Sequence, residues 1–280
     1  VKGRTPNMNM STKPIEIVEV KTAAEFKRFI QLPRELYTDP SSPFVMPLEM
    51  HVKMMIGKLG SPNKHLFLAF EGERCVARVA AKVHNYQGHM ALHFGFFECA
   101  ADRPDAGQKL IEEAHKRYPH LTLKGPFHFR QEDPYIGFLV EGFQYDPYFL
   151  MPWNPPFYDD VMKAAGLSKA MDLFTYDVDA REGLPAKVIE AGEKAIKDHG
   201  IIIEDVTKKN IRIHATRIAK IFNNALSDNW GFEEFEKAQI DEMVTMLRLF
   251  IDTRMVTIAR QGDQDVGCLI MIPNYNPIIK

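Results

Sequence analysis

The stretch from Leu66 to Cys99, LFLAFEGERCVARVAAKVHNYQGHMALHFGFFEC, decides the fold class of this chain. It contains three apolar runs joined by polar turns, which is the pattern of three antiparallel strands. The first turn, Glu71-Gly72-Glu73-Arg74, is short enough for a tight hairpin. The third run ends with phenylalanines beside one carboxylate, Glu98. A three-strand meander is therefore predicted at the centre of the first half.

A similar hairpin is predicted near the end of the chain, at Met255–Ile272 (MVTIARQGDQDVGCLIMI). Like the first hairpin, it combines an apolar strand, an acidic glycine-containing turn and a second apolar strand. Each hairpin follows a strand and helical segments, so the order strand, helices, hairpin occurs twice. This repetition predicts two related structural units. Because only the first continues into further elements, the second unit is expected to be truncated at its C-terminal side.

The composition is that of an ordinary globular protein. With 280 residues, 45% hydrophobic and 26% charged, the chain is long enough for two domains with real cores. A net charge of −2 gives no electrostatic reason to expect nucleic acid or an anionic membrane surface as a partner. No apolar run reaches the roughly 18–20 residues of a membrane span. A cytoplasmic protein is the default expectation, and three widely spaced cysteines predict buried, reduced thiols.

Changes in composition divide the chain into four parts. Residues 1–14 are polar and contain proline, so a disordered extension without a secretory signal is expected there. Residues 15–143 form the first predicted unit. The connection at 144–171 begins with QYDPYFLMPWNPPFY, whose prolines and aromatic residues predict an extended segment held by its side chains. Residues 172–280 form the second predicted unit.

Apolar periodicity predicts the elements of each unit. In the first unit we expect a strand at Ile15–Val20, a helix from Thr22 that ends or kinks at Leu32-Pro33, a short helix at Glu49–Lys58, a helix at Asp105–Tyr118 and a strand at Leu121–Lys124. The short apolar segment Tyr135–Gly142 fits a helix and a strand equally well. After a short helix at Asp159–Ala165, we expect strands at Asp172–Val178 and Ile201–Ile203, and helices at Leu184–His199, Ile211–Leu226 and Phe235–Ile251.

The element order resembles that of the GNAT (general N-acetyltransferase) fold, an α/β (α+β) arrangement with a mixed, mostly antiparallel sheet flanked by helices. More specifically, the sequence resembles a bacterial family of tandem GNAT-like N-acyltransferases, from Ile15 to Ile272. The segments that carry the resemblance are FKRFIQLPRELYTDP at Phe26–Pro40, FLAFEGERCVARVAA at Phe67–Ala81, FGFFE at Phe94–Glu98, GPFHF at Gly125–Phe129, GFLVEGF at Gly137–Phe143, NPPFY at Asn154–Tyr158 and GLSKAMDLFTY at Gly166–Tyr176. Bacterial ceramide synthases, which join a fatty acyl thioester to a sphingoid amine, look similar to members of this family.

The resemblance implies an N-acyltransferase that uses acyl-CoA or an acyl-carrier protein and acylates a lipid-like or hydrophobic amine without a metal. In such folds the pyrophosphate of acyl-CoA lies at the start of the helix that follows the meander. The matching positions make Phe96, Phe97, Arg103 and Gly107 candidate cofactor-binding residues. The usual loop motif is [Q/R]-x-x-G-x-[G/A]. This chain departs from the motif in two ways. Alanine, not glycine, stands three residues after Arg103, and the residue after Arg103 is Pro104, which has no N–H to donate.

Two candidate catalytic residues follow from the same resemblance. Glu98 stands where some GNAT enzymes hold a general base, and a carboxylate among phenylalanines should have a raised pKa, closer to what proton transfer from an ammonium needs. Tyr135 corresponds to a tyrosine on the helix after the fifth strand, which would protonate the leaving thiolate. The alternatives for Glu98 are a strand-end residue facing water or a cap of the next helix, and the alternative for Tyr135 is an ordinary core aromatic.

Four further residues are candidates for substrate binding. His128 and Arg130, with Glu132-Asp133 nearby, could bind the amine or a head group, although an ordinary solvated loop also fits. Trp153 and Tyr158 could line an acyl channel or could pin the connecting segment. No spacing of histidine, cysteine and carboxylate residues predicts a metal site. Motifs of serine hydrolases, zinc peptidases and P-loop NTPases are absent from the sequence.

Two other classes stay open beside the enzyme. One is a non-catalytic binding or structural module whose GNAT unit has lost its CoA loop, and the other is a lipid-binding protein that uses the same cleft without chemistry. A geometric observation would help to discriminate among them: strands Leu92–Cys99 and Leu121–Lys124 should diverge into an open V beside the helix that starts near Asp105. No pattern in the sequence predicts the acyl chain length, the amine or the oligomeric state.

Overall fold

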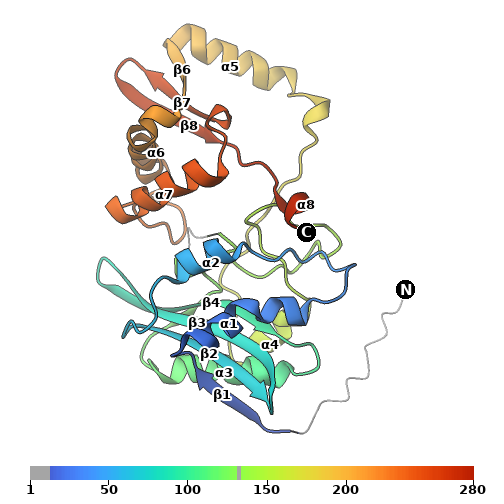
Figure 1. Ribbon diagram of the computed structural model, residues 1–280. Helices are drawn as coiled ribbons and strands as arrows, with labels where there is room; N and C mark the ends of the chain where they lie inside the picture. The colour runs from blue at the N-terminus through green and yellow to red at the C-terminus, as the bar shows by residue number, and fades with distance from the viewer. Residues whose placement is uncertain (1–12, 131–133) are drawn as a thin grey trace. The chain divides into compact units, whose positions relative to one another are not determined.

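The computed structural model describes residues 13–130 and 134–280, with the elements shown in Figure 1. Of the extension expected at residues 1–14, only Lys13 and Pro14 are described, and Glu132 and Asp133 also lie outside the described residues. The chain forms two compact units. Unit 1 comprises the residues up to Asp172 together with 275–280, and unit 2 comprises 173–274. The chain therefore leaves unit 1, builds unit 2 and returns to unit 1.

Unit 1 contains a five-stranded sheet in the order β1-β2-β3-β4-β5. Its strands are β1 (Ile15–Glu19), β2 (Lys64–Glu71), β3 (Arg74–Tyr86), β4 (His89–Cys99) and β5 (Leu123–Lys124). Neighbouring strands are antiparallel, except that β4 and β5 are parallel. The predicted three-strand meander is thereby confirmed as β2, β3 and β4, and the mixed, mostly antiparallel sheet agrees with the predicted fold class.

Helices cover both faces of this sheet (Figure 1). Unit 1 has the helices α1 (Ala23–Leu36), α2 (Glu49–Ile56), α3 (Pro104–Lys116), α4 (Tyr158–Ala164) and, from the returning segment, α8 (Asn276–Ile279). Successive residues of a strand point to opposite faces. Accordingly, Phe67 packs in a core with residues of α3 and α4, whereas Leu68 packs in a second core with residues of α1 and α2.

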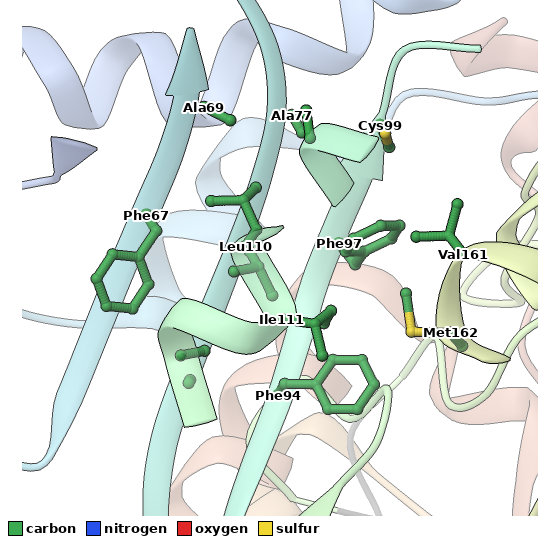
Figure 2. Packing of buried hydrophobic residues seen from close by; sticks show 14 of the residues in the cluster. Phe67, Ala69, Ala77, Phe94, Phe97, Cys99, Leu110, Ile111, Val161 and Met162 are labelled. Atoms are coloured by element: carbon green, nitrogen blue, oxygen red, sulfur yellow. The ribbon is translucent and has the colours of Figure 1, made fainter. Parts of the chain in front are cut away.

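The core beneath α3 and α4 holds β4 in place (Figure 2). Phe94 and Phe97 of β4 lie in the same cluster as Leu110 and Ile111 of α3 and Val161 of α4. Each large apolar side chain buried in this way stabilises the fold by about 1.5–3 kcal/mol. The end of β4, where the candidate base is located, is therefore attached to a rigid layer of packed side chains.

Helix α1 continues to Leu36, although the sequence predicts an end or a kink at Leu32-Pro33. Pro33 has no N–H to donate to the carbonyl of Phe29, one turn earlier. That carbonyl instead accepts a hydrogen bond of 2.7 Å from Nη1 of Arg78, on β3. The helix can pass the proline because a buried guanidinium satisfies the acceptor that the proline leaves free.

Unit 2 contains a three-stranded antiparallel sheet in the order β6-β7-β8. Its elements are α5 (Ala186–His199), β6 (Ile201–Asp205), α6 (Ile211–Ala225), α7 (Lys237–Phe250), β7 (Val256–Gln261) and β8 (Gln264–Ile270), with short 3-10 helices at Ala180–Glu182, Lys208–Asn210 and Thr253–Met255. From β6 onward this is the order strand, two helices, hairpin, as in β1 to β3. Helices α6 and α7 pack on each other, and α6 contacts β8.

The two hairpins share their register as well as their order. In the β2–β3 hairpin, Ala69 lies opposite Ala77 and the register shifts at the following residue. In the β7–β8 hairpin, Ala259 lies opposite Gly267 and the register again shifts at the following residue. The turns contain glycines with positive φ, Gly72 at 61° and Gly262 at 57°. Both predicted hairpins are confirmed, and their bulges lie at the same distance from the turn.

Two predicted elements are wrong. The segment Tyr135–Gly142 forms neither helix nor strand. Its backbone enters the left-handed region repeatedly, with φ of 65° at Tyr135 and 89° at Gly142, which interrupts both kinds of element. The segment Asp172–Val178 is exposed and forms no strand. Its apolar residues favour a strand, but the strand that pairs with β7 in unit 2 is β6, so the segment has no place in the sheet.

Candidate active site

A bulge near the end of β4 sets the direction of Glu98. Arg78 of β3 lies opposite Glu98, and Ala80 lies opposite Gly95, so the two residues Phe96 and Phe97 share one partner position on β3. Phe96 has a φ of 52°, which places it in the left-handed region. Bulges of this kind bend a strand and re-aim its side chains. Glu98 therefore leaves the regular alternation of β4 and lies directly across from a buried arginine.

The edge of β4 beyond this bulge has no strand partner among the described residues. Strand β5 pairs with β4 only up to His93, and one further hydrogen bond of 2.7 Å joins the N–H of Phe127 to the carbonyl of Phe94. At the end of β4, the N–H of Cys99 donates to Oη of Tyr158 at 2.8 Å. Regular pairing of β4 with β5 thus ends at His93, and a tyrosine hydroxyl satisfies the amide of Cys99 at the end of β4.

Two tyrosines from distant parts of unit 1 meet at Glu98. Oη of Tyr37, just after α1, donates to Oε2 of Glu98 at 2.6 Å. Oη of Tyr158, the first residue of α4, donates to the same oxygen at 3.0 Å. The two hydroxyl oxygens are themselves 3.0 Å apart. One carboxylate oxygen therefore accepts two hydroxyl hydrogens, an arrangement that stabilises the ionised form of Glu98.

The other oxygen of Glu98 faces Arg78. Nη2 of Arg78 lies 3.5 Å from Oε1 of Glu98, and Nη1 binds the carbonyl of Phe29 that Pro33 leaves free. The guanidinium also lies over the ring of Phe29, 5.1 Å from its centroid. Arg78 is 3% exposed, so it brings a positive charge into the interior next to the carboxylate. We call Glu98, Tyr37, Tyr158 and Arg78 the Glu98 cluster.

Burial and hydrogen bonding act in opposite directions on the Glu98 cluster. Burial raises the pKa of Glu98 above its ordinary value of 4.5, while Arg78 and the two tyrosine hydroxyls oppose that rise. Burial and the neighbouring charge of Glu98 raise the pKa of both Tyr37 and Tyr158 well above 10. The tyrosines therefore stay protonated and act as donors. Glu98 is left as a carboxylate whose proton affinity is higher than that of an exposed glutamate.

The Glu98 cluster borders a cavity that is open to solvent. Most of its lining residues are apolar or aromatic, among them Phe44, Met46, Leu48, Val52, Met55, Phe96, Phe97, Phe138, Phe149, Met151 and Trp153, but polar atoms make up nearly as much of the wall as apolar atoms do. The rings of Tyr37 and Phe44 stack at 4.0 Å, and Trp153 meets the Tyr37 ring edge-on at 5.9 Å. Such a cavity suits an apolar chain that ends at a polar group.

Most of the predicted site residues meet in this cavity. Its wall includes Phe96, Phe97, Glu98, His128, Tyr135, Trp153 and Tyr158, whereas Arg103, Gly107 and Arg130 are not among the lining residues. Tyr135 was expected on a helix, but it lies in an irregular segment, where its N–H donates to the carbonyl of Leu150 at 3.0 Å. Burial lowers the pKa of His128 to about 3, so its imidazole is neutral. It would therefore contact a ligand as an uncharged group.

Arg103 has a structural environment rather than that of a ligand-binding residue. It is 1% exposed. Its Nη1 binds Oε1 of Glu71 at 2.6 Å, its Nε binds Oδ1 of Asp105 at 2.9 Å, and its Nη2 binds the carbonyl of Lys13 at 3.2 Å. These contacts tie the start of α3 to β2 and to Lys13, two residues before β1. The guanidinium is occupied by the protein itself, so its placement does not support the predicted contact with a cofactor.

Gly107 is also explained by packing. A Cβ at this position would lie 2.8 Å from Cζ of Phe97 and 3.0 Å from Sγ of Cys99. A Cβ at the first distance would force the Phe97 ring or the helix to shift, and the second distance is tighter than nearly all Cβ contacts. Glycine therefore lets α3 lie close against β4. Its predicted contact with acyl-CoA has no support from this position, which is buried between the helix and the sheet.

The start of α3 does not fit a pyrophosphate in the way that the resemblance implies. Pro104 is the first residue of the helix and offers no N–H. Hydrogen bonds from Arg74 lower the pKa of Asp102, and those from Arg103 lower the pKa of Asp105, so both carboxylates are ionised at neutral pH. A phosphate here would meet two negative charges, and the arginines beside them are already paired.

Sequence reasoning did not select two members of the Glu98 cluster. Tyr37 lies in a proline-rich segment, where no motif distinguishes it from its neighbours. Arg78 is one charged residue inside the apolar run CVARVAA. That contrast is a usable signal, because a charge in a buried strand is rarely left without a partner. Its partner Glu98 lies on the next strand, so pairing β3 with β4 would have brought the two together.

The described part of the chain contains no group of three or more histidine, cysteine or carboxylate side chains arranged to hold a metal ion. Within the same residues, no helix has the length and apolar character needed to cross a membrane. The thiols of Cys75, Cys99 and Cys268 are free. The first two are buried, and burial raises the pKa of Cys75 to about 11, which keeps that sulfur protonated and unreactive.

The fold of this chain is that of the GNAT acetyltransferases. A GCN5-related glucosamine N-acetyltransferase region in a fungal multi-domain GH3 beta-N-acetylglucosaminidase aligns with 93% of this chain and 28% of that one, with a TM-score of 0.51 and 10% sequence identity. At this identity the similarity shows the fold alone. No protein-family model matches the sequence.

Two relatives extend the comparison to sequence. The chain is 28% identical over 282 residues to a bacterial ceramide synthase of Caulobacter vibrioides (strain NA1000 / CB15N), covering 95% of this chain and 71% of that protein. It is 23% identical over 268 residues to the protein YghO of Escherichia coli (strain K12), covering 91% of this chain and 67% of that protein. Together with the fold, these relatives support membership of the tandem GNAT-like family that the sequence resembles.

Proposed function

We propose that this protein is an N-acyltransferase that transfers an acyl group from a thioester, on CoA or an acyl-carrier protein, to a lipid-like or hydrophobic amine. The observation that carries the proposal is the Glu98 cluster, a buried carboxylate with two tyrosine donors in the wall of a cavity whose lining residues are mostly apolar or aromatic. The GNAT fold and a relative named as a ceramide synthase support the same class of reaction.

Glu98 is the proposed general base. An aliphatic amine is protonated at neutral pH, and only the neutral amine has a lone pair that can attack a thioester. The ammonium passes one proton to Glu98, whose pKa is raised by burial toward the range in which it can hold that proton. The nitrogen then attacks the thioester carbonyl carbon, and a tetrahedral adduct forms with a new C–N bond.

Tyr135 is the proposed general acid. When the adduct collapses, the C–S bond breaks and the leaving sulfur takes the phenolic proton of Tyr135. The second proton of the new ammonium nitrogen then restores the phenol. Burial raises the pKa of Tyr135 well above 10, so the phenol is protonated at the start of the cycle. The products are the amide and the free thiol, and the proton held by Glu98 returns to solvent.

Tyr37, Tyr158 and Arg78 are positioning residues in this mechanism. Their hydrogen bonds and charge oppose the effect of burial and keep Glu98 ionised before the amine binds. His128 and Trp153, which line the same cavity, are the proposed contacts of the substrate. Phe96 and Phe97 are proposed to contact the acyl group, because they share the bulge that precedes Glu98.

We further propose that unit 2 is a second GNAT-like unit. Support comes from its element order after α5 and from a hairpin with the same bulge position as the hairpin of unit 1. In this proposal β6, rather than the segment at Asp172–Val178, is the counterpart of β1. The Glu98 cluster consists only of residues from unit 1, so the mechanism above is assigned to unit 1.

A specific observation favours a second candidate, a lipid-binding module without catalysis. The start of α3, where the pyrophosphate of acyl-CoA would lie, carries Pro104 and two ionised carboxylates. A cavity without this contact could hold an apolar chain and leave it unchanged. The two candidates differ in one measurable product, the free thiol.

The test is thiol release by the full-length protein. Acyl-CoAs of several chain lengths are incubated with long-chain and small amines, and free thiol is followed with a chromogenic disulfide. Thiol formation that depends on the amine is expected, and no thiol above background with any pair would exclude the enzymatic function. Glu98→Gln should slow this release by roughly 10²–10⁴, whereas replacing Glu112, an exposed glutamate on α3, by glutamine should leave the rate unchanged. Equal rates for the two variants would exclude Glu98 as the base.

A further inference from the structure

The last residues of unit 1 form part of the wall of its cavity. Tyr275–Lys280 follows the whole of unit 2 in the sequence, yet it packs with unit 1. Within this segment, the short helix α8 contributes Asn276 and Ile279 to the lining of the cavity. These are the lining residues farthest in sequence from the Glu98 cluster. We call Tyr275–Lys280 the return segment.

Contacts along its length hold the return segment in place. They are a 2.7 Å hydrogen bond from Nδ2 of Asn276 to the carbonyl of Pro147, a 3.0 Å ion pair between Lys280 and Asp146, and an edge-to-face contact of 5.2 Å between Tyr275 and Phe149. Asn276 is 8% exposed, so its hydrogen bond is shielded from water and holds more firmly than an exposed one. The anchors lie on one stretch, 146–149, which itself lines the cavity.

We propose that the return segment determines the length of the alkyl chain that the cavity accepts, with Ile279 as the residue that limits it. The inference rests on the proposed transfer involving a long apolar chain. The Glu98 cluster holds the reacting end, and the anchors of the return segment are separate from it. An alkyl chain that starts at Glu98 must end against some other part of the wall. Ile279 presents an apolar side chain to the cavity from a separately anchored element.

Changing the size of residue 279 should therefore move the chain-length optimum. Each methylene that moves from water into the cavity raises kcat/KM about fourfold, equivalent to about 0.8 kcal/mol. Ile279→Ala removes about three carbon atoms from the wall and should favour longer chains. Ile279→Phe adds volume at the same place and should favour shorter ones. Opposite shifts for the two variants separate a size effect from general damage.

Ile278 provides the matched control. It is the neighbouring residue of α8, also an isoleucine, but it is 84% exposed and does not line the cavity. Ile278→Ala should keep the wild-type profile. The profile is measured in two arms, one with acyl thioesters of increasing length and a fixed amine, the other with alkylamines of increasing length and a fixed acyl thioester. The arm that shifts shows which substrate's chain lies against Ile279.

A binding measurement tests the inference independently of catalysis. Trp153 lines the cavity, and the chain contains two tryptophans, so Trp230→Phe leaves Trp153 as the reporter. Saturated fatty acids from octanoic to stearic acid are titrated against its fluorescence in the full-length protein. The length of the tightest ligand should rise with Ile279→Ala and fall with Ile279→Phe. An unchanged length, or the same change with Ile278→Ala, overturns the proposal, whether or not thiol release is observed.

Discussion

Replacing Tyr158 by phenylalanine removes one hydroxyl that serves two buried partners. That hydroxyl accepts from the N–H of Cys99 at 2.8 Å and donates to Glu98 at 3.0 Å. Losing the bond to a charged group costs about 1.5–3 kcal/mol of unfolding free energy. Leaving the buried N–H without a partner costs about 1–3 kcal/mol more. Tyr37→Phe removes only a donor to Glu98. Its cost in unfolding free energy should therefore be smaller by the amount that the unpaired N–H of Cys99 contributes.

Urea unfolding of both variants, followed by tryptophan fluorescence, measures this difference. Tyr158→Phe should unfold with a free energy lower than that of Tyr37→Phe by about 1–3 kcal/mol. Equal values would show that the amide of Cys99 does not depend on the Tyr158 hydroxyl. A larger loss for Tyr37→Phe would reverse the assignment, because Tyr37 would then hold the cluster together.

In the same two variants, Tyr158→Phe and Tyr37→Phe, the pH dependence of the unfolding free energy should also change. The pKa of Glu98 in the folded protein is above its ordinary value of 4.5, so the folded state binds this proton more tightly than the unfolded state. The unfolding free energy contributed by Glu98 therefore falls as the pH rises from about 4.5 toward the folded pKa. Removing either tyrosine donor raises that pKa further and should extend the decline to higher pH. A decline that ends at lower pH in both variants would contradict the assigned donor directions.

Three further substitutions separate catalysis from packing. Glu98→Gln should lower kcat/KM for thiol release by roughly 10²–10⁴ while fatty acids still quench cavity fluorescence, and an unchanged rate would refute its role as base. Arg103→Met should lower the free energy of urea unfolding by about 3–5 kcal/mol, because Glu71 is left buried without its partner. Fatty-acid binding should persist in this variant. Loss of binding at wild-type stability would contradict the structural role of Arg103. Gly107→Ala should lower the unfolding free energy by about 1–3 kcal/mol in the same assay, because the new Cβ would lie 2.8 Å from the ring of Phe97. An unfolding free energy equal to that of the wild type would show that α3 can move away from the ring.

The sheet could be predicted from the sequence because its signals are local. The turn at Gly72 and the apolar runs on either side determine the β2–β3 hairpin, and the same pattern determines the hairpin at Gly262. The failures occurred where the outcome depended on a distant partner. Asp172–Val178 has the composition of a strand but forms none, and α1 does not end at Pro33 because a residue on β3 satisfies its free carbonyl.

The candidate site shows the same division. Glu98 could be selected because its position at the end of an apolar strand is visible in the sequence. Tyr37 and Tyr158 lie 121 residues apart, and no local pattern indicates that both hydroxyls reach the same oxygen. Arg103 was selected for its position in a motif, yet its guanidinium binds the carboxylates of Glu71 and Asp105 and the carbonyl of Lys13. Which partner a charged residue finds is determined by packing across the sheet.

The return segment has a consequence for the synthesis of this protein. The roughly 100 residues from Leu173 to Asn274 separate the body of unit 1 from its last residues, and at about 5–20 residues per second they take about 5–20 s to translate. During that interval the sheet of unit 1 has left the ribosome, but Asn276 and Ile279 have not. The newly made unit 1 therefore exposes part of its cavity to the ribosome surface, chaperones and lipids for several seconds before its own chain completes the wall.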